Sequence, residues 1–158
     1  MTPERMDGMW ETRARTDADC ETVTSWIDDA EALYLFTGPR LTWPLEPRHL
    51  QAMTLSPGLT AWVVVDSTDD AIAGHFDLTL EGGSARLARV IIAPALRGRG
   101  LSHTLVILAE ERARELGAQQ LTLNVIDGNL PAITTYERAG FRRTASERPG
   151  ISSMTLAL

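Results

Sequence analysis

The sequence predicts an α/β (α+β) fold, in which a mixed, mainly antiparallel sheet of about six or seven strands is flanked by about four helices. Two observations support this prediction. Short segments rich in β-branched and aromatic residues alternate with turn residues, and one longer segment, residues 101–116, carries apolar residues at helical spacing. The chain has 158 residues, the usual size of one domain with one core. We therefore expect a single domain over residues 1–158.

The N-terminal part is predicted to begin with a strand and a helix. Residues 10–15 alternate as in a strand, and Asp17 is placed to cap a helix that runs to about residue 30. Three prolines within residues 38–47 interrupt regular structure, so loops here could overhang a site. A short helix over residues 47–54 is expected to follow.

Three consecutive antiparallel strands are expected in the middle of the chain. Residues 60–66 and 71–80 are rich in strand-forming residues, and the polar stretch between them suits a hairpin turn. A glycine turn leads into the third strand, residues 85–92. Pro94 ends this strand because proline has no N–H group for the ladder.

The C-terminal part is predicted to contain two helices and three strands. Gly117 follows the periodic segment 101–116 as a C-terminal cap, which supports a helix there. Pro131 near a first turn and Gly140 after a last turn mark a second helix. The other predicted segments are this second helix, residues 130–139, and strands over residues 121–126, 141–145 and 152–158.

Composition and charge limit the function classes. All fifteen basic residues are arginines and the net charge is −6, which disfavours a nucleic-acid surface and mildly favours a cationic acceptor substrate. The lone Cys20 cannot form an intrachain disulfide, and no apolar stretch is long enough for a signal peptide or a membrane span. We expect a cytoplasmic protein with no membrane or nucleic-acid partner.

A Gly-x-Gly turn connects the strand ending at Ile92 with the helix over residues 101–116. Gly98 and Gly100 allow a tight turn and close approach of a ligand, and the N–H groups at the helix start carry partial positive charge. Such a turn binds phosphate or pyrophosphate well; alternatively, the glycines serve turn geometry alone. His103 stands where a dinucleotide fingerprint needs glycine, and a Walker A loop needs a lysine that the chain lacks.

Two motifs resemble those of the GNAT superfamily of N-acetyltransferases. An apolar strand and proline, residues 90–94, precede Arg-Gly-Arg-Gly-Leu-Ser at residues 97–102, similar to the family's Arg/Gln-x-x-Gly-x-Gly/Ala signature with Ser102 in the last position. Residues 124–141 resemble its second diagnostic stretch, an Asn, a helix carrying Ala and Tyr, then Gly-Phe. The specific resemblance covers residues 87–141, and the weaker one most of the chain.

This resemblance implies transfer of an acetyl group from acetyl-CoA to a primary amine by direct nucleophilic attack. It also implies a strongly twisted sheet in which two central parallel strands splay apart to admit the cofactor. Main-chain amides of residues 97–102 would hold the pyrophosphate, and residues 90–92 the pantetheine arm. The implied cofactor-binding residues are Val90, Ile91, Ile92, Arg97, Gly98, Arg99, Gly100, Leu101, Ser102, Asn129 and Tyr136.

The resemblance assigns a general acid but leaves the general base open. Tyr136 would protonate the departing thiolate, unless it is a buried aromatic that only fills the core. Asn129 is expected to bind the cofactor, to cap the following helix, or both. Related ribosomal-protein alanine acetyltransferases place a Glu on the fifth strand, where this chain has Asn124.

Candidate bases therefore come from other positions. His75 is the first candidate, because a histidine has a suitable intrinsic pKa and this one lies beside the cofactor strand. A structural histidine is the alternative, and Asp77, Asp127 or a water relay to a distant carboxylate are further ones. Arg86 and Arg89 on the cofactor strand either contact an acceptor carboxylate or, as we expect, form ion pairs on a solvated face.

The remaining expectations concern metals, partners and rival functions. His49, His103 and the acidic residues show no metal-ligand spacing, and Cys20 has no partner that marks a nucleophile, so we expect neither a metal nor a covalent intermediate. The acceptor is expected to be a small-molecule amine or a peptide N-terminus. Homodimers are common in the family, but no sequence feature establishes one. There are two competing hypotheses for the function: a catalytically inactive acyl-CoA sensor and a pure interaction domain.

Overall fold

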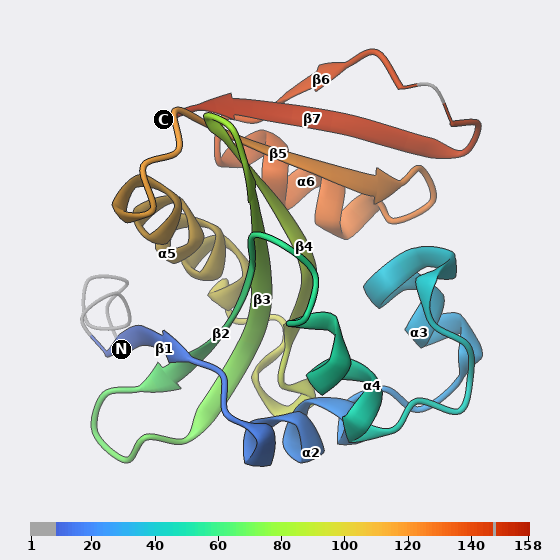
Figure 1. The fold of residues 1–158 in the computed structure, drawn as a ribbon, viewed down its shortest axis with the longest axis vertical. Coiled ribbons are helices and arrows are strands. Elements are labelled where there is room, and N and C mark those ends of the chain that lie inside the picture. The colour runs from blue at the N-terminus through green and yellow to red at the C-terminus, as the bar shows by residue number, and fades with distance from the viewer. Residues whose placement is uncertain (1–8, 147) are drawn as a thin grey trace.

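The computed structural model describes residues 9–146 and 148–158. These residues form a seven-stranded sheet with the strand order β1-β2-β3-β4-β5-β7-β6, which confirms the predicted fold class (Figure 1). Within it β4 and β5 pair in parallel, and all other neighbouring strands are antiparallel. The strands are β1 (Trp10–Ala14), β2 (Leu59–Asp66), β3 (Ile72–Glu81), β4 (Ser84–Ile92), β5 (Gln120–Ile126), β6 (Arg142–Thr144) and β7 (Ile151–Ala157).

The described residues also form five α-helices and two short 3-10 helices. One helix prediction is wrong in extent: the helix expected over residues 17–30 ends at Ser25, and a second helix, which was not predicted, begins at Ala30. Thr16, rather than Asp17, caps the first, and Asp29 caps the second by accepting a hydrogen bond from the Ala32 N–H. The helices are α2 (Asp17–Ser25), α3 (Ala30–Thr37), η1 (Gly38–Arg40), α4 (Pro47–Met53), η2 (Pro94–Leu96), α5 (Leu101–Glu115) and α6 (Leu130–Arg138).

Helices cover both faces of the central strands. In Figure 1, α5 lies on one side of β3 and β4, and α3 and α4 lie on the other. The main core lies beneath α5 and α6 and contains Phe76, Leu87 and Leu105. A smaller apolar cluster beneath α2, α3 and α4 contains Leu33 and Leu50. The central part of β4 is therefore enclosed on both faces.

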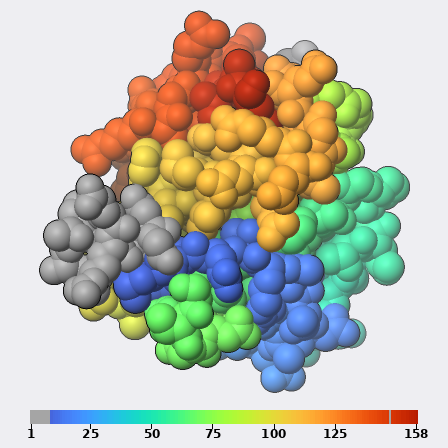
Figure 2. Space-filling view, turned by 90° about the vertical axis from the view of Figure 1, so that its left-hand side faces the viewer, coloured from blue at the N-terminus to red at the C-terminus, as the bar shows by residue number. Residues whose placement is uncertain are grey.

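The long helix α5 is also tied to the edge of the sheet. Figure 2, viewed from the α5 side, shows it in yellow and orange between the blue N-terminal segments and the red C-terminal strand. Arg112 of α5 donates hydrogen bonds to the Thr12 side chain and main chain of β1, and its guanidinium lies 4.4 Å from the centre of the Trp62 ring. The strand β1 is thereby held against the helix. No helix in the described ranges is both long and apolar enough to cross a membrane.

The two parallel strands separate after a short paired section. Ser84–Leu87 pair with Gln120–Leu123, and beyond this point each strand continues without pairing to the other. A bulge in β4 accompanies the separation: Arg89 and Val90 together lie opposite Phe76 of β3, and Arg89 has a φ of 50°. The splayed parallel strands implied by the family resemblance are therefore present.

Replacing a fully buried core side chain tests this account of the packing. Phe76→Ala is expected to lower the free energy of unfolding by about 3–5 kcal/mol, because Phe76 is 0% exposed and its loss leaves a cavity beneath α5. Urea denaturation measures the change. Leu55→Ala, at a residue that is 84% exposed, is the control and should change stability by less than about 0.5 kcal/mol. Equal effects of the two substitutions would contradict the assigned core.

Candidate active site

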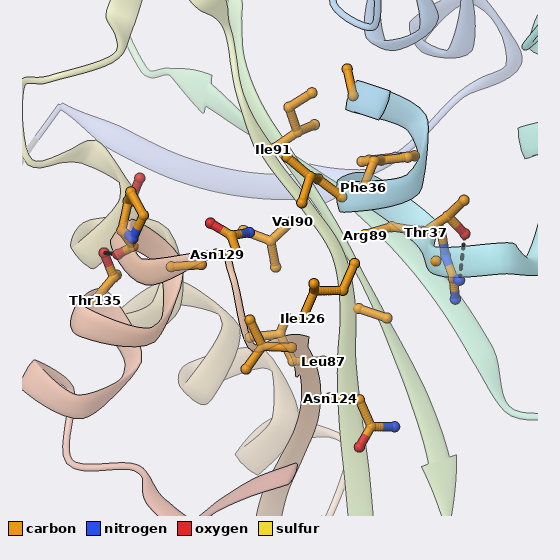
Figure 3. Close-up of a pocket in the computed structure, with 18 of the residues that line it drawn as sticks. Phe36, Thr37, Leu87, Arg89, Val90, Ile91, Asn124, Ile126, Asn129 and Thr135 are labelled. Atoms are coloured by element: carbon orange, nitrogen blue, oxygen red, sulfur yellow. Dashed lines mark hydrogen bonds between the residues drawn. The ribbon is translucent and has the colours of Figure 1, made fainter. Parts of the chain in front are cut away.

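A cavity of about 660 Å³ opens where β4 and β5 separate. Its walls come from α3 and η1 on one side, from the two strands, and from the beginnings of α5 and α6 on the other side (Figure 3). Its volume is in the range of small-molecule sites, about 300–1,000 Å³. The chemistry of the cavity depends on which side chains and main-chain groups face it.

The predicted phosphate-binding turn lies at the end of the cavity next to α5. Gly98 and Gly100 both have a φ of 78°, which is a conformation that favours glycine. Gly100 is the N-cap of α5 and supplies no side chain to bind the first N–H groups of the helix, so these groups are available to an anion. Arg97 and Ser102 line the cavity, whereas the residues between them do not: Gly98, Arg99 and Gly100 lie outside the lining, and the Leu101 side chain is buried in the core.

The free edge of β4 forms the base of the cavity. Beyond Leu87 this edge has no partner strand in the described part of the chain, because β5 has moved away. Val90, Ile91 and Ile92 line the cavity along this stretch. Unpaired main-chain groups of a strand edge readily form hydrogen bonds to an extended ligand. The turn and the strand edge thus face one continuous space.

Tyr136 of α6 lies in the same cavity and is 8% exposed. Its ring packs against Phe141 with 5.7 Å between ring centres. Its hydroxyl has no hydrogen-bond partner within residues 9–146 and 148–158. Burial raises the pKa of Tyr136 to about 12, so the phenol is protonated at neutral pH and can donate a proton.

Asn129 stands at the N-cap position of α6, but its side chain makes no capping hydrogen bond. The capping alternative is therefore wrong for the side chain. Asn129 lines the cavity on the α6 side, and Figure 3 shows it near Val90 of β4, which lines the same cavity. Its amide is available to a ligand.

The structure does not bring His75 into the cavity lining. The ring is 0% exposed, with Nε2 3.0 Å from Arg15 Nη1 and Nδ1 2.8 Å from the Arg89 carbonyl oxygen. Because a guanidinium only donates, Nε2 must accept and the Nδ1–H must donate to the carbonyl. Burial lowers the pKa of His75 to about 3. Both ring nitrogens are occupied, so His75 has no lone pair left for an acceptor amine.

Asp77 is likewise occupied. Arg89 donates to it through Nε and through Nη2, the latter at 3.0 Å from Oδ1, and both side chains are at most 3% exposed. The expectation that Arg89 forms an ion pair is met, but the pair is buried rather than on a solvated face. Burial raises the pKa of Asp77, although the adjacent guanidinium opposes this effect. Arg89 also approaches Thr37 of α3, as the dashed line in Figure 3 shows.

Of the two remaining polar residues considered for the catalytic site, Asn124 lies in the cavity lining and Asp127 does not. Asn124 lines the cavity and accepts a hydrogen bond from Ser153 at 2.8 Å. Asp127 accepts a hydrogen bond from Ser152 and is not part of the lining. Within the described ranges, no group of three His, Cys, Asp or Glu side chains is arranged to hold a metal ion.

Sequence reasoning missed α3 as a wall of the cavity, although the stretch 38–47, which contains η1, was expected to form loops that could overhang a site. This wall brings Asp28, Asp29, Thr37 and Arg40 to the cavity. Asp29 carried a detectable signal, since an aspartate preceding an apolar helical segment is a common N-cap. Arg40 follows a glycine and a proline in a 3-10 turn, and no local pattern predicted that it would face a site.

Comparison with known proteins agrees with this arrangement. A family model described as the acetyltransferase (GNAT) family matches residues 21–141. The chain belongs to this family. The N-acetyltransferase YjgM of Escherichia coli, itself uncharacterized, is 33% identical over 134 residues, covering 82% of this chain and 80% of the relative. Streptothricin acetyltransferase of Streptomyces lavendulae is 36% identical over 80 residues, covering 49% of this chain and 42% of that enzyme.

Solved GNAT structures share the fold. Spermidine N-acetyltransferase from Vibrio cholerae in complex with CoA and spermine has a TM-score of 0.75 at 20% identity, covering 95% of this chain and 96% of that one. The structure of AAC(6')-Ib with ribostamycin and coenzyme A has a TM-score of 0.78 at 17% identity, covering 94% of this chain and 93% of that one. The predicted GNAT fold and N-acetyltransferase class are therefore confirmed.

The buried state of His75 predicts how stability depends on pH. The unfolded chain binds a proton at His75 near the ordinary pKa of 6.5, whereas the folded chain does so only near 3. The contribution of His75 to the free energy of unfolding is therefore at its maximum above pH 6.5. Below that pH it decreases by about 1.4 kcal/mol per pH unit. Urea unfolding from pH 7 to pH 4 should show a steeper loss for the wild type than for His75→Gln. Parallel curves would contradict a neutral, buried His75.

Proposed function

We propose that the protein transfers an acetyl group from acetyl-CoA to a primary amine by direct attack within the cavity between β4 and β5. The observation that carries this proposal is the convergence of three features on one cavity. These are the glycine turn before α5, the free edge of β4, and the buried phenol of Tyr136.

Each feature suits one part of acetyl-CoA. The N–H groups of residues 98–102, at the start of α5, provide a positive pole for the pyrophosphate, whereas the Arg97 N–H donates to the Pro94 carbonyl. The edge of β4 from Val90 to Ile92 offers main-chain groups to the amides of the pantetheine arm. Asn129, whose side chain does not cap α6, adds a side-chain amide on the α6 side of the cavity. The thioester then lies toward the interior of the cavity.

Tyr136 acts as the general acid in this proposal. The amine nitrogen forms a bond to the thioester carbonyl carbon, the carbon–sulfur bond breaks, and the sulfur takes the electron pair. Tyr136 gives its proton to that sulfur, since its phenol is kept protonated by burial. Solvent returns a proton to the phenolate before the next turnover.

Removal of the amine proton does not require a side-chain base at the reacting nitrogen. His75 and Asp77 use their hydrogen-bonding groups elsewhere, and Asn124 is not basic. The lining includes the carboxylates of Asp28 and Asp29 in the loop before α3. We infer that water in the open cavity relays the proton away from the amine.

The ligands bound in similar solved structures support a small amine as the acceptor. The solved structures with similar folds include complexes with spermine and with the aminoglycoside ribostamycin, both of which are amines. A thiol-release assay with acetyl-CoA and a panel of amines tests the proposed reaction. Binding of acetyl-CoA without thiol release from any amine would favour an acyl-CoA sensor.

Removing the Tyr136 hydroxyl tests the general acid. Tyr136→Phe should lower kcat about 100-fold, because the thiolate then departs without a positioned proton donor. Affinity for acetyl-CoA and stability should change little, since the hydroxyl forms no hydrogen bond within the described chain. Tyr34→Phe is the matched control, because Tyr34 is 45% exposed and lies outside the cavity lining. Wild-type kcat in Tyr136→Phe would remove the residue from the acid role.

A pair of glycine substitutions tests the pyrophosphate turn. Gly98→Val and Gly82→Val both place a side chain at a positive φ, 78° and 59°, where an added Cβ meets no protein atom within 4 Å. Both should lose stability through backbone strain of about 1–3 kcal/mol. Only Gly98→Val should also weaken CoA binding, by about tenfold or more, because its side chain enters the space assigned to the pyrophosphate. Isothermal titration with CoA measures this, and unchanged affinity would refute the assigned turn.

A further inference from the structure

Four arginines face the cavity away from the phosphate-binding turn. They come from distant parts of the chain, and we refer to them as the arginine cluster: Arg40 of η1, Arg86 and Arg89 of β4, and Arg148 of the β6–β7 loop. Arg86 precedes Ile92 by six residues in β4, which corresponds to about 20 Å of strand. Ile92 adjoins the turn, so Arg86 lies at the opposite end, where the acceptor must enter.

The charge of the cluster is only partly neutralised by the protein. Arg89 is paired with Asp77, and both are buried. Arg40 and Arg86 form no ion pair with any acidic group in residues 9–146 and 148–158. Burial, followed by repulsion from Arg86 and Arg89, lowers the pKa of the Arg40 guanidinium. The cluster thus retains positive charge facing the cavity.

The acidic residues of the cavity lie too far along α3 to cancel this charge. Asp28 and Asp29 precede α3, and Asp29 caps that end of the helix. Arg40 follows its other end, beyond Thr37. The helix has eight residues, so its ends are about 12 Å apart. A ligand in the cavity therefore meets carboxylates at one end of α3 and guanidinium groups at the other.

We propose that the arginine cluster selects an acceptor amine that also carries a carboxylate, as a free amino acid does. This inference rests on the proposed acetyl transfer and specifies its acceptor. Arg40, Arg86 and Arg148 provide the planar, multiply donating groups that bind carboxylates in bidentate fashion. Arg89, already paired with Asp77, positions β4 rather than binding the carboxylate.

The proposed acceptor, an amine with a carboxylate, differs from the polycationic acceptors of polyamine and aminoglycoside acetyltransferases. The net charge of −6 led to a mild expectation of a cationic acceptor. The cluster reverses that expectation locally, because charges that line a cavity act on a bound ligand more strongly than distant surface charges do. A polycation such as spermine would face repulsion from the cluster.

An acceptor series with and without the carboxylate tests the proposal. Free amino acids, their carboxamides and spermine are compared in a thiol-release assay with acetyl-CoA. For the best amino acid, kcat/KM should exceed that of its carboxamide by about tenfold or more, as expected when a charge-assisted contact is lost. The carboxamide has the less basic amine and hence more of the neutral form, so a lower rate cannot be attributed to amine protonation.

Charge-removing variants assign the effect to the cluster. Arg86→Gln and Arg40→Gln should each raise KM for the amino acid about tenfold and leave KM for acetyl-CoA unchanged. Arg142→Gln is the matched control, because Arg142 is exposed on β6 and outside the cavity lining, and the change in net charge is the same. An increase in KM for acetyl-CoA in Arg86→Gln would overturn the proposal, since the cluster would then bind a cofactor phosphate.

The outcomes separate this inference from the proposed function. Turnover of spermine or of carboxamides at rates equal to the amino acids would overturn the inference and leave the transferase proposal intact. If no amine is acetylated, the proposed function fails, and calorimetric titration then decides the inference by itself. In that titration N-acetyl amino acids should bind at least about tenfold more tightly than their carboxamides, and Arg86→Gln should abolish the difference. Equal binding of the two forms would overturn the inference.

Discussion

The cavity depends on the buried ion pair between Arg89 and Asp77. Arg89 occupies a bulge with a φ of 50°, a conformation that costs about 1–3 kcal/mol for such a residue. The carboxylate of Asp77 holds its side chain, and the Nδ1–H of His75 binds its carbonyl. These contacts stabilise the bulge that accompanies the separation of β4 from β5. His75 and Asp77 thus support the shape of the site, although the sequence presented them as candidate bases.

Local sequence signals predicted most of the helices and strands but not where the pairing between neighbouring strands ends. Residues 101–116 match α5 almost to the residue, because apolar spacing and Gly117 are local features. The helix expected over residues 17–30 ends at Ser25, and the separate helix α3 begins at Ala30 with Asp29 as its cap, so the apolar spacing up to residue 30 did not mark one continuous helix. The early end of β4–β5 pairing has no local signal, and only the family resemblance implied it.

The same distinction applies to the site. The glycine turn and Tyr136 belong to short contiguous motifs, and Arg97 and Ser102, which flank the glycines, line the same cavity as Tyr136. The state of His75 could not be predicted, because it depends on Arg15, sixty residues away, and on the bulge at Arg89. The cluster joins Arg40 to Arg148, which belong to elements at opposite ends of the sequence. Such contacts exist only once the chain is folded.

The arginine cluster also bears on the missing base. Attack requires a neutral amine, and a nearby positive charge lowers the pKa of an ammonium group by disfavouring its charged form. The same repulsion contributes to the lowered pKa of Arg40 within the cluster. On the proposed assignment, a guanidinium that binds the acceptor carboxylate also stands near its amine and increases the neutral fraction. Under the proposed mechanism, water then removes the remaining proton, and acetyl transfer needs no basic side chain at the position of Asn124.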